Sequence, residues 1–270
     1  MHIDSVEVLS ADSCPIRYEV TGKGPAIILV DGALCYRGLG PSLPMSRMLV
    51  SQGFRVARFD RRGRGESGAV APYAVEREID DIAAIARHLG GKVSLWGMSS
   101  GAILALLAGS HIPGIQRVAV YEAPVLFDAS RPLMTEEWNT IGECLAQGDP
   151  DGALKSFLAM VGMPAPVRFI LTMLPIWRQL RSIAPTLLHD RAITAPFQRG
   201  EKVSASSLPN FSGPILVTAG DKSPSWLTEN NQALARLFPG ATYAVIHGDD
   251  HMVMPARHKE RLAAFFHAAG

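Results

Sequence analysis

Short apolar runs rich in β-branched residues alternate along the chain with amphipathic stretches of helical length, and this alternation limits the fold more than any other feature. Parallel strands need a long crossover, usually a helix, so this rhythm predicts a mostly parallel, doubly wound α/β sheet. The expected strands are Val6–Leu9, Ile16–Val20, Ala26–Val30, Phe54–Asp60, Lys92–Gly97, Arg117–Glu122, Pro214–Gly220 and Thr242–Gly248. The first two are expected to pair as an antiparallel hairpin.

Two of the intervening helices are visible in the spacing of their apolar residues. The first ends at Gly90 and Gly91, and its apolar residues lie three or four positions apart on one face: Val75, Ile79, Ile82, Ala86 and Leu89. The second spans Pro255–Ala268, with proline in the first turn and Leu262, Phe265 and Phe266 directed inward.

The segment 125–208 interrupts the rhythm, because it contains no convincing strand. It carries large apolar residues and is punctuated by prolines: Trp138, Phe157, Met160, Met163, Phe169, Met173 and Trp177, with Pro164, Pro166, Pro175 and Pro185. We expect several short helices here, inserted at the carboxyl edge of the sheet, where ligands bind in such folds. The large side chains then either line a pocket or form a second small core.

Composition excludes several classes of protein. The 270 residues carry 26 Lys and Arg against 25 Asp and Glu, a net charge of +1, which is too neutral for nucleic acid to be the main partner. Apolar stretches such as Ala102–Ala108 are too short to cross a membrane. The first ten residues, MHIDSVEVLS, do not resemble a secretory signal. The cysteines are odd in number and widely separated: Cys14, Cys35 and Cys144. We therefore expect a cytoplasmic protein with ordinary buried or half-buried thiols.

The strongest chemical motif is Gly97-Met98-Ser99-Ser100-Gly101, a G-x-S-x-G sequence between a predicted strand and a predicted helix. The sharp turn holds Ser99 in a strained conformation, and the flanking glycines let strand and helix approach closely. The hydroxyl then stands at a helix N-terminus, where free N–H groups favour an oxyanion. Ser99 is thus the candidate nucleophile.

A serine nucleophile needs a base, and position along the chain favours His251. This residue follows the last predicted strand after a short turn and precedes the C-terminal helix, which brings it to the same edge of the sheet. His88, His258 and His267 are expected on solvent-facing sides of helices, and His247 is expected to be structural.

Three motifs together resemble the α/β-hydrolase family: the GMSSG turn, the DRRGRGES turn at 60–67, and the GDDH sequence at 248–251. The resemblance covers essentially the whole chain. It implies an α/β-hydrolase fold with an eight-stranded sheet, helices on both faces, a helical cap after strand six, and a Ser–acid–His triad. It divides the chain into a core of residues 1–124 and 209–270 and a cap of 125–208. It also implies no metal and no organic cofactor.

The sequence departs from this family after the third strand, where Asp31-Gly32-Ala33 replaces the usual His-Gly. The glycine is kept, so the backbone amides of Ala33 and Ser100 are still expected to form an oxyanion hole. Asp31 either accepts a structural hydrogen bond, which we favour, or disfavours anionic substrates. The DRRGRGES turn is expected to be architectural, with Asp60 and Glu66 neutralising much of its arginine charge.

The second departure concerns the triad acid. Many family members carry Gly-x-x-Asp after strand seven, but here Ser223 stands three residues after Gly220. Asp221 comes two residues early, and Lys222 is a candidate ion-pair partner for it. Other members take the acid from the end of strand six, where this chain has Glu122. We favour Glu122 and keep Asp221 as the alternative.

These residues predict a serine hydrolase of esterase type that acts on a small, largely apolar substrate. Serine at the elbow argues against dehalogenase and epoxide-hydrolase chemistry, which uses a carboxylate nucleophile. Carbon–carbon bond hydrolysis, thioester cleavage and perhydrolysis share the same triad and stay open. A ligand-binding protein without turnover is the alternative from a different class, and a homodimer is a possible assembly.

Overall fold

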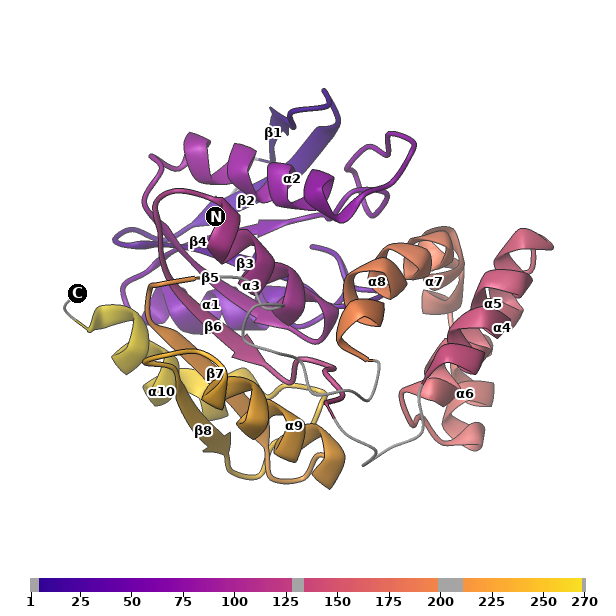
Figure 1. Ribbon diagram of the computed structural model, residues 1–270. Helices are drawn as coiled ribbons and strands as arrows, with labels where there is room; N and C mark the ends of the chain where they lie inside the picture. The colour runs from indigo at the N-terminus through magenta and orange to yellow at the C-terminus, as the bar shows by residue number, and fades with distance from the viewer. Residues whose placement is uncertain (1–4, 128–133, 199–210, 269–270) are drawn as a thin grey trace.

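The computed structural model describes residues 5–127, 134–198 and 211–268. An eight-stranded sheet lies at its centre in the order β1-β2-β4-β3-β5-β6-β7-β8 (Figure 1). Its strands are β1 (Ser5–Leu9), β2 (Pro15–Thr21), β3 (Ala26–Val30), β4 (Arg55–Phe59), β5 (Val93–Met98), β6 (Ile115–Tyr121), β7 (Ile215–Gly220) and β8 (Thr242–Ile246). Strand β2 pairs antiparallel with β1 and β4, and the other neighbours are parallel. The predicted sheet is confirmed, with strand ends within two residues of those expected.

Helices cover both faces of this sheet, as the side chains of β3 illustrate. Ile28 and Val30 pack into one hydrophobic cluster, and Ile27 and Leu29 pack into another on the opposite face, since alternate residues of a strand point to opposite sides. The first cluster includes α2 (Val75–His88), α3 (Ser100–His111) and α9 (Ser225–Arg236). The second includes α1 (Ser42–Ser51) and α10 (Pro255–His267). The two helices predicted from spacing are therefore confirmed as α2 and α10.

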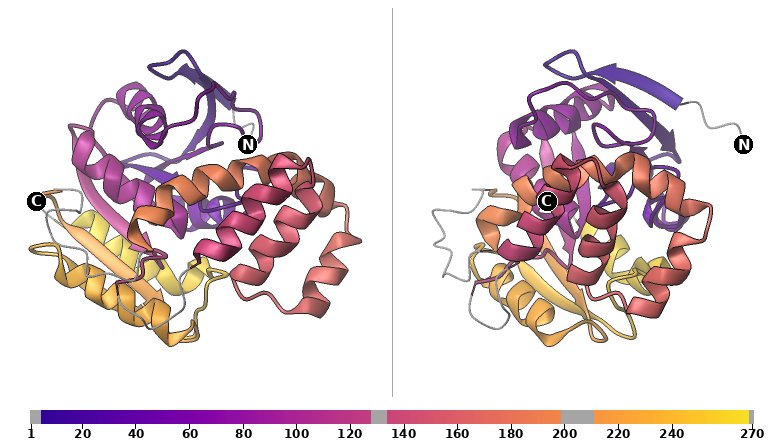
Figure 2. Two further views of the ribbon diagram at one scale, coloured as in Figure 1. Left: turned by 45° about the vertical axis from the view of Figure 1, so that its right-hand side comes forward. Right: turned by 90° about the vertical axis from the view of Figure 1, so that its right-hand side faces the viewer.

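Short helices fill the connection between β6 and β7, as predicted. They are α4 (Thr135–Ala146), α5 (Pro150–Met160), α6 (Ala165–Thr172), α7 (Ile176–Ile183) and α8 (Leu187–Thr194), with 3-10 turns η1 (Ala184–Thr186) and η2 (Ala195–Phe197). We call Thr135–Phe197 the cap. Figure 2 shows the cap gathered at one side of the sheet. The boundary expected at 208 falls outside the described residues, so the division into core and cap at 125 and 208 stays a prediction.

The large apolar residues of the cap divide between a core and the surface. Trp138 and Trp177 are buried in a cap cluster that also includes Leu34 from the loop after β3. Phe169 and Met173, in and just after α6, are instead 67% and 64% exposed. Our expectation that all of these side chains line a pocket or form a core was therefore wrong for these two.

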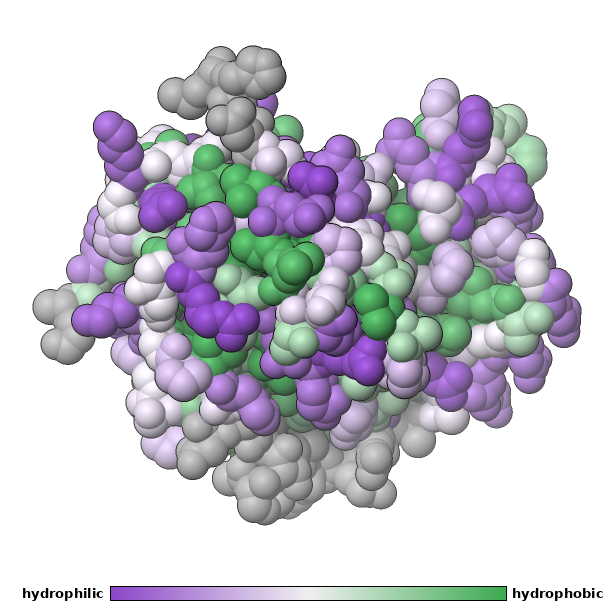
Figure 3. Space-filling view, turned by 90° about the horizontal axis from the view of Figure 1, so that it is seen from above, coloured by the Kyte–Doolittle hydropathy of each residue, from purple (hydrophilic) through white to green (hydrophobic). Residues whose placement is uncertain are grey.

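The outer surface mixes polar and apolar side chains. The face seen from above carries separate apolar groups between charged ones (Figure 3). Within the described ranges, no helix is both long and apolar enough to cross a membrane. Cys14 is buried and Cys35 and Cys144 are half-buried, all three as free thiols. Burial raises the pKa of the Cys35 thiol to about 12, so this thiol is not a ready nucleophile.

Candidate active site

Ser99 stands at the sharp turn between β5 and α3. Its backbone has φ 52° and ψ −131°, a region that non-glycine residues rarely adopt. Hydrogen bonds hold the turn, because Ser99 N donates to Tyr121 O (3.0 Å) and Ala102 N donates to Ser99 O (2.9 Å). The strain that the sequence motif predicts is therefore present in the backbone of this residue.

The flanking glycines explain how strand and helix approach so closely. A Cβ atom added to Gly97 would lie 2.3 Å from Gly101 O, and one added to Gly101 would lie 2.3 Å from Val30 O. Real Cβ atoms essentially never come that near to backbone, so any larger residue displaces one of these segments. The glycines thus fix the position of Ser99 at the edge of β5.

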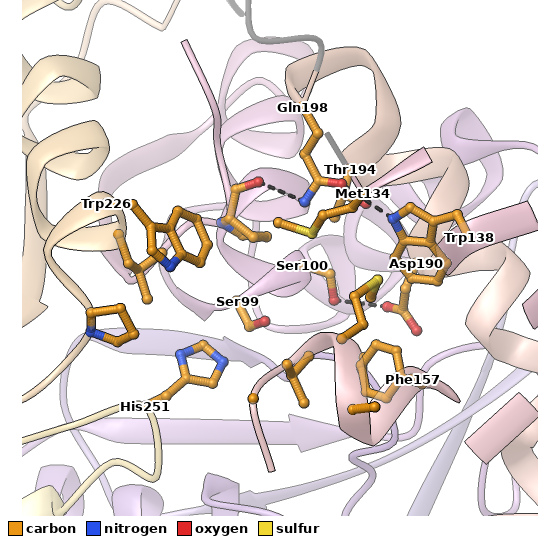
Figure 4. Close-up of a pocket in the computed structure, with 18 residues that line it drawn as sticks. Ser99, Ser100, Met134, Trp138, Phe157, Asp190, Thr194, Gln198, Trp226 and His251 are labelled. Atoms are coloured by element: carbon orange, nitrogen blue, oxygen red, sulfur yellow. Dashed lines mark hydrogen bonds between the residues drawn. The ribbon is translucent and has the colours of Figure 1, made fainter. Parts of the chain in front are cut away.

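His251 and Glu122 meet at this edge, although 129 positions separate them in the chain. His251 Nδ1 lies 2.7 Å from Glu122 Oε2, and the carboxylate is fully buried whereas the histidine side chain is 39% exposed. His251 and Ser99 line one cavity, and Figure 4 shows both side chains at it. The other ring nitrogen of His251 is therefore left for chemistry inside the cavity.

The second oxygen of Glu122 is also held. Oε1 accepts hydrogen bonds from Gly220 N (2.9 Å) and Ser223 Oγ (2.5 Å). Burial by itself raises the pKa of Glu122, but the hydrogen bonds from His251, Ser223 and Gly220 outweigh it and hold this pKa below its usual value. Ser223, which the sequence shows as a departure from the family pattern, thus contacts the carboxylate that faces His251.

The alternative acid, Asp221, is occupied elsewhere. Its carboxylate accepts a hydrogen bond from Gly248 N (2.7 Å) and lies 3.0 Å from His247 Nδ1, on the exposed side of the loop. The ion pair expected with Lys222 is replaced by this pair with His247. Asp221 and His251 are therefore not brought together.

The loop that carries His251 is anchored by buried polar groups. Asp249 Oδ2 lies 2.7 Å from His258 Nε2, and Asp249 Oδ1 accepts from Met254 N (3.1 Å). Tyr121, at the end of β6, donates its hydroxyl proton to Asp250 O (2.6 Å). His258 is fully buried, so its prediction as a surface histidine was wrong: burial lowers its pKa, and Asp249 partly offsets this. His88 and His267 are exposed, as expected.

The two residues expected to form the oxyanion hole reach the cavity from different segments. Ala33 follows β3 and Ser100 opens α3, and both residues line the cavity. In the described part of the chain, neither the Ala33 N–H nor the Ser100 N–H donates to another backbone group. For Ser100 this is expected, because the first N–H groups of a helix have no partner within the helix. A Cβ on Gly32 would lie 2.9 Å from Ser99 Cβ, so glycine is needed for this loop to pass the elbow.

Asp31 does not line this cavity. Its side chain is buried, and within the described residues its Oδ1 has no hydrogen-bond partner, so the expected structural bond stays a prediction. Burial raises the pKa of Asp31 to about 6, although the side chain of Ser42 and the guanidinium groups of Arg64, Arg58 and Arg61 act in the opposite direction.

The arginines of the 60–67 turn are buried rather than surface-exposed, and their partners are not those expected. Arg61 binds Glu78 of α2 through two bonds of 2.7 and 2.8 Å. Arg62 binds Asp81 of the same helix at 2.7 and 2.8 Å. Asp60 and Glu66, predicted to neutralise these arginines, pair with Arg37 instead. The turn is therefore architectural, but its charges are balanced by α2 and the cap.

The cavity between core and cap has a volume of about 360 Å³. Most of its wall is apolar: Met134, Trp138, Phe157, Met160, Trp226 and Leu227. Among residues 5–127, 134–198 and 211–268, no three His, Cys, Asp or Glu side chains come together as a metal site. The arrangement brings a serine, a histidine backed by a carboxylate, and the residues Ala33 and Ser100 together in a largely apolar space.

A charged residue that we did not predict from the sequence also lines the cavity. Asp190 of α8 is 1% exposed and contacts Ser100, Arg61 and Arg64. Burial raises its pKa, but these three partners outweigh burial and lower it below the usual value. Residue 190 lies about 90 positions from Ser100 in the chain, so only the docking of the cap brings the two together.

Comparisons with known proteins agree with this architecture. The family model described as "Alpha/beta hydrolase family" matches residues 31–265. An alpha/beta hydrolase from Sphaerobacter thermophilus is 36% identical, with a TM-score of 0.86 over 97% of this chain and 100% of that one. An esterase from Exiguobacterium antarcticum shares the fold at 20% identity and TM-score 0.73, over 98% and 100% of the two chains. A bromoperoxidase from Bacillus anthracis does so at 21% and 0.72, also over 98% and 100%. The chain belongs to the alpha/beta hydrolase family.

Proposed function

We propose that this protein is a serine hydrolase that cleaves small, largely apolar esters through an acyl-enzyme on Ser99. One observation carries the proposal: a strained serine and a histidine share a cavity, and a buried carboxylate holds the far nitrogen of that histidine. This is the geometry that nucleophilic acyl transfer by serine requires.

The reaction follows from the positions of these groups. Glu122 fixes the proton of His251 on Nδ1, so Nε2 is free to take the proton of Ser99 as Oγ bonds to the carbonyl carbon. The carbonyl oxygen becomes an oxyanion, which the N–H groups of Ala33 and Ser100 stabilise. The carbon–oxygen bond of the ester then breaks, and His251 gives its proton to the departing alcohol. Water attacks the acyl-enzyme by the same steps and releases the acid.

The cavity supports the substrate class. A volume of about 360 Å³ suits a small molecule, and the wall of methionine and aromatic side chains favours apolar groups beside the scissile carbonyl. The esterase and the bromoperoxidase reported above share only the fold with this chain, so they do not select the bond that is cleaved.

Active-site labelling and turnover test the proposal together. A fluorophosphonate probe is expected to label the wild type and Ser110→Ala, a serine control on the same helix α3, but not Ser99→Ala. Short-chain p-nitrophenyl esters should be hydrolysed by the same two proteins. Equal labelling of Ser99→Ala would refute the nucleophile. Tight ester binding without turnover in the wild type would identify a ligand-binding protein. Faster turnover of a thioester, a diketone or a peracid-forming mixture would show that this compound, and not an ester, represents the substrate class.

A further inference from the structure

A carboxylate of the cap contacts the catalytic edge of the core, beside a second cap contact in which Arg64 Nε donates to Thr186 Oγ1 (3.0 Å). Asp190, in α8, accepts a hydrogen bond of 2.7 Å from Ser100 Oγ. Both residues are at most 2% exposed and line the cavity, and Ser100 carries one of the two N–H groups of the proposed oxyanion hole. A charge-assisted bond in such a dry place is stronger than a neutral one and holds its donor in a defined position.

The same carboxylate is connected to the other N–H segment. Arg64 Nη2 donates to Asp190 Oδ2 (2.6 Å), and Arg64 Nη1 donates to Gly32 O (2.6 Å) and Cys35 O (3.2 Å). These two carbonyls lie on either side of Ala33 in the chain. Arg61 acts in parallel, because its Nη1 lies 2.8 Å from Asp190 Oδ1 and 3.3 Å from Asp31 O.

One cap side chain therefore joins both halves of the oxyanion hole. Ser100 is bound to Asp190 directly, and the loop around Ala33 is bound to it through a guanidinium group. An oxyanion hole works only when both N–H groups are held at the right distance before charge develops. Displacement of a donor by a fraction of an ångström weakens transition-state stabilisation without removing the substrate's other contacts.

We propose that Asp190 is a positioning residue for acyl transfer: it docks the cap onto the oxyanion hole and sets the separation of the Ala33 and Ser100 N–H groups. The inference rests on the proposed function, because it assumes that an oxyanion forms beside Ser99. It gives the cap a role in the chemical step in addition to shaping the cavity.

A second buried ion pair, Asp81 with Arg62, serves as a control that distinguishes a positioning role from a contribution to stability alone. Asp81 of α2 is equally buried and binds Arg62 through two bonds of 2.7 and 2.8 Å, but it does not line the cavity. Replacement of either aspartate by asparagine removes the negative partner of a buried guanidinium group and should lower the stability of the fold. Asp190→Asn alone should also lower the rate of chemistry.

The test compares Asp190→Asn, Ser100→Ala and Asp81→Asn by thermal melting and by ester kinetics, with kcat expressed per active site titrated with the fluorophosphonate. We expect Asp190→Asn to lower kcat by about 10- to 100-fold with KM changed less than about 3-fold, since donors are displaced rather than lost. Ser100→Ala keeps its N–H and should lower kcat by about 5-fold, with a smaller loss of stability than Asp190→Asn because Arg61 and Arg64 stay paired with Asp190. The double variant should be no slower than Asp190→Asn, because both changes break one connection.

The outcomes are distinguishable. Asp81→Asn should melt earlier yet keep its kcat per titrated site. If Asp190→Asn and Ser100→Ala also keep the wild-type kcat per titrated site, the positioning role is wrong while the proposed function stands. If Asp190→Asn does not fold, Ser100→Ala decides the question in the same way. A wild type that neither reacts with the probe nor turns over esters overturns the proposed function and this role with it.

Discussion

Substitution of Asp31 by asparagine should stabilise the protein near neutral pH. The carboxyl is buried and its pKa is raised from 3.8 to about 6, so the folded state binds this proton more tightly than the unfolded chain does. The contribution of Asp31 to stability is therefore full below pH 3.8 and is lost as the pH rises through 6. At 1.36 kcal/mol per pKa unit, the ionised carboxylate costs the folded state about 3 kcal/mol at pH 8.

The measurement is the free energy of unfolding in urea at pH 4.5, 6 and 8 for the wild type and Asp31→Asn. The advantage of the variant should be about 2 kcal/mol larger at pH 8 than at pH 4.5, where much of the wild-type carboxyl is protonated in the folded state. Asp80→Asn, on the partly exposed side of α2, controls for the loss of one charge and should change stability by less than about 0.5 kcal/mol. A variant that becomes less stable than wild type as the pH rises would show that Arg61 and Arg64 need this carboxylate, and would refute the reasoning.

Three other changes test the site and its frame. Glu122→Gln should lower kcat for a p-nitrophenyl ester by about 10³- to 10⁴-fold, because the amide favours the wrong tautomer of His251. Asp221→Asn should keep kcat within about twofold of the wild type. The reverse order would assign the acid to Asp221. Gly97→Ala places a Cβ 2.3 Å from Gly101 O and should destabilise the fold by about 3 kcal/mol or more in urea unfolding, and an unchanged midpoint would contradict the close contact. Phe157→Ala enlarges the cavity, so kcat/KM across esters from acetate to octanoate should peak at a longer chain; an unmoved peak would show that the acyl group lies elsewhere.

Local sequence signals predicted the fold well because each one has a local physical cause. The run AIILV at 26–30 is apolar at every position. A central strand needs this because its side chains point alternately to the two faces of the sheet and both faces are buried. The GMSSG turn needs glycine on both sides of Ser99, so its geometry is written in five consecutive residues. The meeting of Glu122 and His251 also followed from topology, because the ends of parallel strands share one edge of the sheet.

Predictions failed where a residue's environment depends on distant packing. His258 sits on a helix whose sequence does not show that Asp249 will bind its ring, nine residues earlier in the chain. Arg61 and Arg62 looked neutralised by their sequence neighbours, but a planar guanidinium in the interior binds the carboxylates that lie in its plane, and these come from α2. Phe169 and Met173 show the opposite case, since their size suggested burial but both are exposed, in α6 and directly after it.

The buried charged groups around Asp190 form a balanced group, and Asp31 lies outside it. Arg61 and Arg64 are matched by Glu78 and Asp190, so these four groups carry no net charge when all are ionised. Burial raises the pKa of Asp31, and Arg64, Arg58 and Arg61 lower it only in part, since each of these arginines already pairs with another carboxylate. Asp190 is different, because two guanidinium groups and a hydroxyl surround its carboxylate and hold its pKa low. A carboxylate close to a developing oxyanion is acceptable only when it is paired. In the proposed reaction, the two arginines would therefore let Asp190 hold Ser100 without repelling the charge that develops beside Ser99.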